Sequence, residues 1–517
     1  MGKIGEAHRD AAIYNTVLAK RMGSQNFLLE SVKTDIRRPP GSTPTNVETD
    51  KETLMIHGKV MFIVLSKFKE THRSGFRSLL LKFILAVQFA VVFSLSAQGP
   101  ATEVDLTQAL TLEQCIQVGL EKSTSMRNAR LNLAIQELRV NTARADYFPR
   151  IFSTGAYDFS DRIDFGFEPE NYNLGLGAQY TIWDNGQREG GFAQAKESLN
   201  ATVSRNEGIK QSLILQITEA YYDVLQYQAL VEVSEQNLAR AQENTQRTKD
   251  FVEAGSLIPA DIATAEVREG NNRLTLLNNQ NLLQVAKARL PRLLGLDPGV
   301  LITVAADESY RLYQQRGTIE RIEIPVEEAI QIALDNRPEF KETESQLRSQ
   351  EWALTLAKLQ RWPRLNADVD YNVNLDDYLR ERENFSDFRS WSAGVSLNFT
   401  FFDGGILGNR VKELAMQLEQ TRENASDLER SVALDVRQTY LNLKRSEAAV
   451  DISKTQVVNA RLSLDVIQGR FDVDKAILLE LLDAQTSYAQ ALTDEVNTFY
   501  DYKITQTRLQ DAMGVLQ

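Results

Sequence analysis

Two long stretches without proline limit what this chain can fold into. They cover residues 186–254 and 405–473. Globular helices usually span roughly 8–20 residues, whereas a helix of ~70 residues, at about 1.5 Å per residue, would reach ~100 Å. One domain core cannot cover such a length, so neighbouring long helices must do so. The pattern predicts a coiled coil or a helical array.

The two stretches belong to two copies of one unit. Trp183 falls on Phe402 when the sequence is shifted by 402 − 183 = 219 residues, and the same shift places Gly295 on Gly514. No insertion is needed between these points. We therefore expect an internal two-fold repeat, with a first copy over residues 98–322 and a second over 323–517.

Each copy opens with an amphipathic helix that ends at an aromatic-Pro-Arg triplet. The triplets are Phe148-Pro149-Arg150 and Trp362-Pro363-Arg364. A residue that precedes proline is pushed out of the helical region. Pro149 and Pro363 are therefore predicted to mark the breaks at which a helix gives way to an extended segment.

The segments after these breaks alternate between apolar and polar residues, which predicts β-hairpins over residues 150–184 and 364–403. An apolar face, a polar face and aromatic residues near the ends are typical of membrane β-strands. A half-buried soluble hairpin packed on a helix is the alternative. Because four strands cannot close a barrel and open edges are not tolerated in lipid, membrane strands would require several chains to share one barrel.

The long helices should begin after Asp184 and Asp403, since aspartate is a favoured N-cap. Their far halves place small and apolar residues at alternating steps of three and four, which indicates coiled-coil seams. Return helices are predicted over 259–295 and 477–514. The first seam contains Val231, Ser234, Leu238, Ala241, Thr245, Thr248 and Val252, and the second contains Val450, Ser453, Val457, Ala460, Leu464, Ile467 and Phe471.

Composition excludes several classes of function. The net charge is −12, which argues against binding of nucleic acid. All three histidines precede residue 98, and Cys115 is the one cysteine, so the repeats lack the usual zinc ligands and the commonest general base. We expect no enzyme, no cofactor and no metal site. Export of heavy metal as cargo stays open, although the sulfurs of Met126, Met416 and Met513 are scattered.

The N-terminal region carries a targeting pattern. Residues 61–97 combine a basic flank, a short apolar run and small residues near Ser96 and Ala97, which predicts a signal peptide. A single membrane-anchor helix is the alternative, although the apolar run is shorter than the ~20 residues that a span needs. Residues 1–60 show no periodicity and are interpreted as a non-native or disordered extension, with Met61 as an alternative start.

The ordered set of features resembles the TolC-type outer-membrane efflux factors. It includes the doubled unit, the breaks before each hairpin, the Asp-x-Gly turns and the run Leu481-Leu482-Asp483-Ala484-Gln485. The resemblance implies a mainly α protein with a small β part. It implies a homotrimer with a long α-helical barrel in the periplasm and a 12-stranded transmembrane β-barrel in outer-membrane lipid, four strands coming from each chain. The implied function is a passive efflux channel that docks to a periplasmic adaptor protein and an inner-membrane transporter.

The resemblance also assigns candidate sites. Glu480 and Asp483 match the pore constriction, where carboxylates favour cations. Asp474 stands where the family usually has glycine, and Ala476 stands where a basic residue latches the closed state, with Lys475 beside it. The residues that match the adaptor-docking turns are Gly255, Ser256, Leu257, Ile258 and Pro259 in the first copy and Asp474, Lys475, Ala476, Ile477 and Leu478 in the second.

Two other functions fit the same sequence. The outlet of a type I protein secretion system would share the architecture and differ in its cargo. A soluble periplasmic coiled-coil scaffold would share the helices, but it leaves the alternating strands unexplained.

Overall fold

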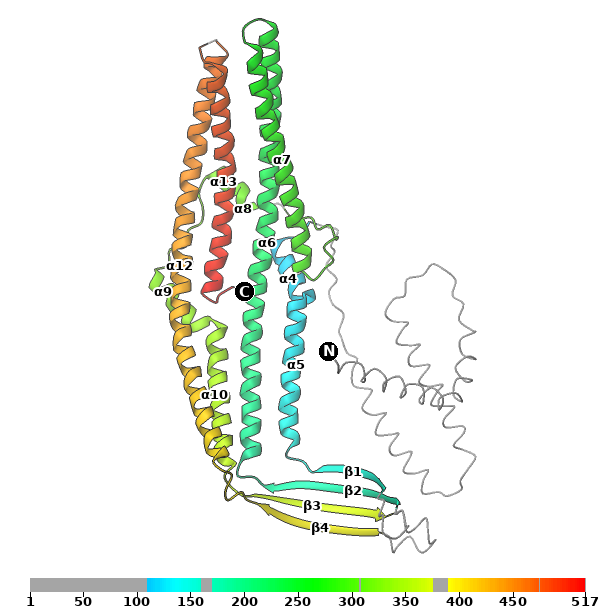
Figure 1. Cartoon of the computed structure of the whole chain (residues 1–517). Coiled ribbons are helices and arrows are strands. Elements are labelled where there is room, and N and C mark those ends of the chain that lie inside the picture. Colours follow the sequence, from blue (N-terminus) through cyan, green and yellow to red (C-terminus); the bar gives the residue numbers. More distant parts are fainter. Residues whose placement is uncertain (1–108, 160–169, 306–307, 375–388, 474, 517) are drawn as a thin grey trace, which may run out of the picture. The chain divides into compact units, whose positions relative to one another are not determined.

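Two very long helices run through the computed structural model, which describes residues 109–159, 170–305, 308–374, 389–473 and 475–516. These residues belong to one compact unit, Thr102–Gln517, and the proposed extension and signal peptide lie outside them. Helix α6 spans Gln187–Glu253 and helix α12 spans Ile406–Phe471. Return helices α7 (Pro259–Leu293) and α13 (Leu478–Ala512) pair with them, and α6 also contacts α13 (Figure 1).

The two coiled-coil seams are confirmed. Every residue of both predicted seams is buried or half-buried in this single chain. Several of them are small hydroxyl residues, and Ser234, Thr245 and Thr248 donate their hydroxyls to backbone carbonyls one turn earlier in α6. This bond satisfies the hydroxyl hydrogen within its own helix, so small residues can face a closely packed neighbour.

Each opening segment is two helices rather than the single helix that its periodicity predicts. The first copy has α4 (Leu112–Lys122) and α5 (Thr124–Ala145), and the second has α9 (Val326–Asn336) and α10 (Pro338–Leu359). Ser123 and Arg337 separate them with extended backbone, at φ −60°, ψ 145° and φ −61°, ψ 129°. Arg337 precedes Pro338, which disfavours helix at that residue, whereas Ser123 caps α5 through its hydroxyl, which accepts from the Met126 amide at 3.3 Å.

A glycine at the end of each return helix packs against each of these breaks. Gly295 and Gly514 have φ values of +76° and +70°. A Cβ on Gly295 would clash with the Lys122 carbonyl, and one on Gly514 would lie 2.9 Å from the Arg337 Cα. Both positions therefore need glycine twice over, for the left-handed backbone and for the space.

The connection between the copies packs beside α13. Helix α8 (Glu308–Arg316) places Tyr310 and Tyr313 against Phe499, with ring centroids 5.0 and 4.8 Å away. The Tyr313 hydroxyl donates to Glu495 across 3.3 Å, and the Tyr502 hydroxyl donates to the Glu320 carbonyl. These contacts pack the connection onto a hydrophobic core that contains buried residues of both copies.

The two hairpins form one antiparallel sheet in the order β1-β2-β3-β4. The strands are β1 (Arg150–Phe159), β2 (Glu170–Trp183), β3 (Arg364–Asn374) and β4 (Arg389–Asn398). β4 ends before Phe399 and Phe401, which the alternation assigns to the strand; their rings pack edge to face at 4.5 Å instead. The expected class, mainly α with a small antiparallel sheet, is confirmed.

The register keeps the predicted alternation across the sheet. Leu176 lies opposite Tyr371, and Tyr371 lies opposite Trp391. The neighbouring pairs Gly177–Asp370 and Asp370–Ser392 fall on the other face. One face of β2, β3 and β4 is therefore apolar and the other is small and polar. Most of the large apolar side chains on this face are exposed in the single chain, Trp391 to 75%.

The lateral order of the elements is the same in the sheet and in the helices. Next to the sheet, α5 packs on α6, α6 on α10 and α10 on α12; toward the turns, α7 packs mainly on α6, α6 on α13 and α13 on α12 (Figure 1). One edge of this unit thus carries β1, α5 and α7, and the opposite edge carries β4 and α12. In the part that the structure describes, no helix is both long enough and apolar enough to cross a bilayer.

Candidate aperture and docking turns

The first turn, Gly255–Pro259, connects α6 to α7 and is largely exposed. Gly255 has a φ of +76° and has open space around its Cα. The amides of Ser256 and Leu257 both donate to the Phe251 carbonyl, and Asp261 accepts from the Ile258 amide at 3.1 Å. Pro259 fits the first position of α7 because its fixed φ suits a helix start.

The second turn connects α12 to α13. Asp474 lies outside the described residues, so its predicted docking role stays a prediction. Beside it, the Lys475 amide donates to the Arg470 carbonyl at 2.8 Å, and the Arg470 guanidinium donates to the Lys475 carbonyl at 2.9 Å. Lys475 and Ile477 are exposed, Ala476 is half-buried and Leu478 is buried.

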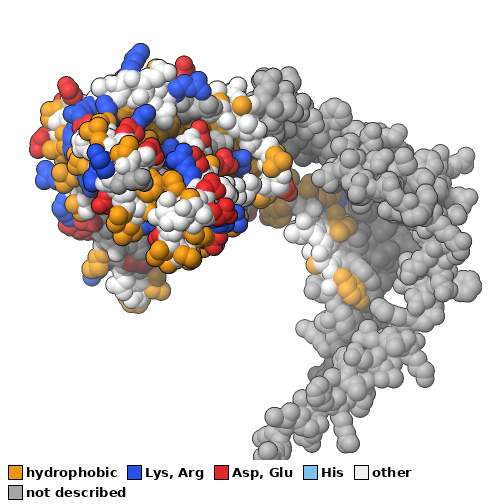
Figure 2. Space-filling view, turned by 90° about the horizontal axis from the view of Figure 1, so that it is seen from above, with side chains coloured by type: hydrophobic (Ala, Val, Ile, Leu, Met, Phe, Trp, Pro, Cys, Tyr) orange, Lys and Arg blue, Asp and Glu red, His pale blue; other side chains and the backbone are white. Residues whose placement is uncertain are grey.

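The two turns lie next to a contact between the helices that lead into them. Phe251 of α6 and Phe471 of α12 meet edge to face, with their ring centroids 5.9 Å apart. Viewed from this end, acidic and basic side chains are interspersed with apolar ones (Figure 2). The end of the molecule that bears the turns therefore presents charged and apolar side chains together, a surface on which shape and a few charges would select a partner.

The two candidate constriction residues occupy one exposed face at the start of α13. Glu480 lies in its first turn, and Asp483 lies three residues later. Spacing of three places both carboxylates on the same side of a helix. Within the described ranges, Glu480 has no ion-pair partner, whereas Asp483 pairs with Arg268 of α7.

Arg268 makes three contacts with one turn of α13. Its two terminal nitrogens lie 2.7 Å from an Asp483 carboxylate oxygen, 2.9 Å from the Leu482 carbonyl and 2.8 Å from the Thr486 hydroxyl. The arginine side chain is 27% exposed and the aspartate side chain 65%. Nothing in the sequence marks Arg268, because only the packing of α7 beside α13 brings the two charges together.

A groove opens beside Arg268, between α6, α7 and α13, with a volume of about 670 Å³. Polar and apolar side chains both line it. Asn244 donates to Gln485 across it, and the Arg240 guanidinium lies 5.2 Å from the centre of the Tyr488 ring. The contact between α6 and α13 therefore includes polar pairs at this level, unlike the apolar interior of the core near Phe499.

The Asp-x-Gly turns join the sheet to the long helices. Asp184 accepts from the amides of Gly186 and Arg188, at 3.3 and 3.2 Å, and Asp403 makes the corresponding bonds at 2.9 and 2.7 Å. These backbone bonds lower the pKa of Asp403. The predicted capping role is thus present, although the N-cap position itself belongs to Gly186 and Gly405.

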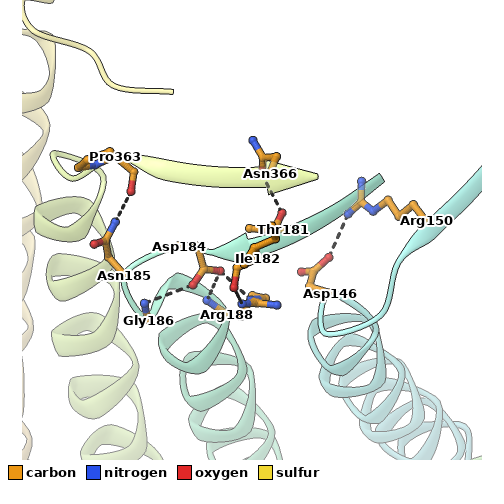
Figure 3. Close-up of polar contacts among 10 residues, drawn as sticks. All are labelled: Asp146, Arg150, Thr181, Ile182, Asp184, Asn185, Gly186, Arg188, Pro363 and Asn366. Atoms are coloured by element: carbon orange, nitrogen blue, oxygen red, sulfur yellow. Dashed lines mark hydrogen bonds and ion pairs between the residues drawn. The ribbon is translucent and has the colours of Figure 1, made fainter. Parts of the chain in front are cut away.

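The breaks at Pro149 and Pro363 lie at the same junction, and Figure 3 shows its polar contacts around the Asp184 turn, with Pro363 of the second copy beside it. Arg188 pairs with Asp184 at 2.9 Å (Figure 3), and its guanidinium also lies over the rings of Tyr147 and Tyr180. The Pro363 carbonyl accepts from the side chain of Asn185. Strands β1 and β3 begin at the residue after each proline as predicted, whereas α5 and α10 end earlier than predicted, at Ala145 and Leu359, so a short turn separates each helix from its strand.

Among the described residues, no group of three or more His, Cys, Asp or Glu is placed to hold a metal ion. Cys115 is buried, and burial together with the Glu113 charge raises its pKa to about 12, which keeps the thiol protonated at neutral pH.

The family described as "Outer membrane efflux protein" matches this chain over residues 115–296 and 329–515. The two matched stretches fall one in each copy of the repeat. Together they cover more than half of the chain.

Two relatives have low sequence identity to this chain, but the similarity extends over most of their length. Outer membrane protein TolC of Salmonella enteritidis is 22% identical over 445 residues, which cover 82% of this chain and 86% of that protein. TolC of Vibrio cholerae is 24% identical and is covered to 84%. The crystal structure of the Campylobacter jejuni CmeC outer membrane channel superposes with a TM-score of 0.68 at 13% identity, covering 81% of this chain and 90% of that one. At that identity the likeness concerns the fold.

Proposed function

The chain belongs to the outer membrane efflux protein family, and on that premise we propose how it forms an exit duct of the outer membrane that extends into the periplasm. The carrying observation is the four-stranded sheet with one apolar face, one polar face and two unpaired edges, β1 and β4. Open edges are not tolerated in lipid. Copies of the chain must therefore supply the missing neighbours.

The two edges suit a head-to-tail ring. The strands alternate in direction. In a ring whose axis runs roughly along the strands, β4 of one copy would therefore lie antiparallel to β1 of the next copy. The helical edges follow the same order, since α12 would meet α5 and α7 of the neighbour. Both helical edges hold exposed apolar side chains that such contacts would cover. On α7 these include Val267, Leu274, Leu277 and Val285, and on α12 they include Leu441, Val458, Leu462 and Val466.

Three copies suit a duct. Two copies would give eight strands, whose interior is just filled by side chains. Three copies give 3 × 4 = 12 strands, with Asn366, Asp368, Asp370 and Asn372 of β3 facing a water-filled interior and the apolar face turned to lipid. The helices would continue the duct as a hollow barrel.

We place the narrow end of the duct at the start of α13. Glu480 and Asp483 would form an acidic ring there, and the turns Gly255–Pro259 and Asp474–Leu478 would dock a periplasmic adaptor that connects to an inner-membrane pump. The duct itself performs no chemistry in this proposal and transports small molecules driven by the pump. A soluble scaffold would leave the apolar face of the sheet uncovered.

Single-particle imaging of the protein extracted from membranes in mild detergent tests the proposal. We expect a hollow three-fold rod with a helical part of roughly 100 Å, from the length of α6 and the helical rise. A monomer or dimer that stays soluble without detergent would overturn it.

A further inference from the structure

Arg268 introduces a positive charge directly beside one of the two candidate aperture carboxylates. We propose that Arg268 determines ion selectivity by offsetting the charge of Asp483, which leaves Glu480 as the dominant free carboxylate of each chain. The inference rests on the proposed function, in which both carboxylates line the aperture. It gives the two acids different surroundings, one paired with an arginine and one without an ion-pair partner among the described residues, although their positions in the sequence look equivalent.

The contact geometry supports the offset. A guanidinium nitrogen 2.7 Å from the Asp483 oxygen forms a charge-assisted hydrogen bond. An ion within a screening length of about 8 Å at physiological salt would respond to the sum of the two charges. Glu480, exposed at the start of α13 and without an ion-pair partner in the described part of the chain, keeps its full charge.

The three acceptors around Arg268 show that it is fixed in place. Leu482, Asp483 and Thr486 present a carbonyl, a carboxylate and a hydroxyl within one turn of α13. The planar fork of arginine can bind all three, whereas a lysine supplies one flexible point charge. Since the side chain is mostly covered, its charge stays beside Asp483 rather than moving into solvent. Arg268 thus holds α7 against this turn of α13 and also supplies the counter-charge for Asp483.

Charge counting separates this role from a purely structural one. Near the aperture each wild-type chain carries −1 from Glu480, −1 from Asp483 and +1 from Arg268, a sum of −1. Arg268→Gln changes the sum to −2, and Asp483→Asn changes it to 0. The double variant returns to −1. A structural clamp alone would predict loss of trimers and no ordered change in selectivity.

The experiment is planar-bilayer recording of purified trimers in a salt gradient. We expect Arg268→Gln to raise the cation-to-anion permeability ratio by about twofold or more, because loss of the arginine leaves one more uncompensated negative charge per chain at a narrow ring. Glu480→Gln and Asp483→Asn should each lower the ratio. The double variant Arg268→Gln/Asp483→Asn should return toward the wild-type ratio, and Arg268→Lys should stay near it because the charge is kept.

Arg289 provides a matched control. It lies on the same helix and pairs with Asp223 of α6 at 3.0 Å, but it is 289 − 268 = 21 residues farther from the turn, about 30 Å along a helix. Arg289→Gln should leave the ratio unchanged. If Arg268→Gln trimers keep the wild-type ratio while the two acid variants lower it, the inference is wrong and the acidic aperture stands. If none of these variants changes the ratio, the proposed aperture itself is wrong.

Discussion

The side-chain amide of Asn185 donates a hydrogen bond to the Pro363 carbonyl, 2.7 Å away, although 178 residues separate the two. Asn185 belongs to the turn that starts α6, and Pro363 ends the segment that leads into β3. The bond therefore ties the two copies of the repeat together where sheet and helices meet. Asn185 is also the one non-glycine residue with positive φ among the described residues, at +60°.

Asn185→Ala should destabilise the folded chain by about 1.5–3.5 kcal/mol. The substitution removes the hydrogen bond, which typically contributes ~0.5–1.5 kcal/mol. It also leaves a residue in the left-handed region that has a Cβ but no polar group to offset the strain, at a cost of ~1–2 kcal/mol. Asn185→Gly keeps the backbone geometry and should show only the loss of the bond. The apparent melting temperature of the detergent-solubilised protein should be highest for the wild type, lower for Asn185→Gly and lowest for Asn185→Ala. Equal melting of all three proteins would contradict this role for Asn185.

Gly295→Ala and Gly514→Ala should each cost more stability than Gly255→Ala. All three glycines have positive φ, but only Gly295 and Gly514 press against another backbone segment. The left-handed conformation alone should cost ~1 kcal/mol at Gly255, and the clash should add ~1–3 kcal/mol at the other two. Thermal unfolding of the three variants measures the difference. The same loss at all three sites would show that the close packing carries no energetic weight.

Glu495 should contribute less to the stability of the fold as the pH rises above about 4.5. Burial raises the pKa of Glu495 above its ordinary 4.5, against the opposing effects of the Tyr313 hydrogen bond and the Lys454 charge. A carboxyl with a raised folded-state pKa stabilises the fold below its unfolded pKa, and this contribution disappears as the pH rises through the folded value. Asp223 and Asp511 are shifted in the same direction by burial.

Glu495→Gln should therefore weaken the pH dependence of the melting temperature between pH 4.5 and 7. The amide can still accept from Tyr313 and carries no charge to desolvate. Glu423→Gln, at an exposed site on α12, serves as the control and should leave the slope unchanged. An identical slope in wild type and Glu495→Gln would mean that other groups set the pH response.

Substitution at the turns should abolish efflux and spare assembly. Gly255→Trp adds bulk to an open turn, and Lys475→Glu reverses an exposed charge, so neither disturbs a buried contact. We expect intact trimers in detergent and loss of compound export from cells. Lys341→Glu reverses an exposed charge on α10, away from the turns, and should export normally. Normal export by both turn variants would remove the docking proposal.

Sequence patterns identify the elements of this fold better than its contacts. The coiled-coil seams and the prolines before each hairpin follow from local rules of periodicity and backbone geometry. Gly295 and Gly514 are visible only as helix ends, because the backbone segments that they touch lie far away in the sequence. Ser123 gives a weak signal for a helix break, since a serine can equally lie within a helix. Arg268 gives none, because its meaning depends on which helix lies beside α7.

The unlike edges of the chain have a consequence for mixed populations. Each copy has two different edges, with β1 on one side and β4 on the other. The proposed ring closes only when every interface forms, yet a copy with one defective edge can still bind a wild-type copy through its intact edge. Such a copy would trap wild-type subunits in incomplete, inactive assemblies. Damage to a single edge should therefore be dominant over the normal allele, whereas loss of the whole chain should be recessive.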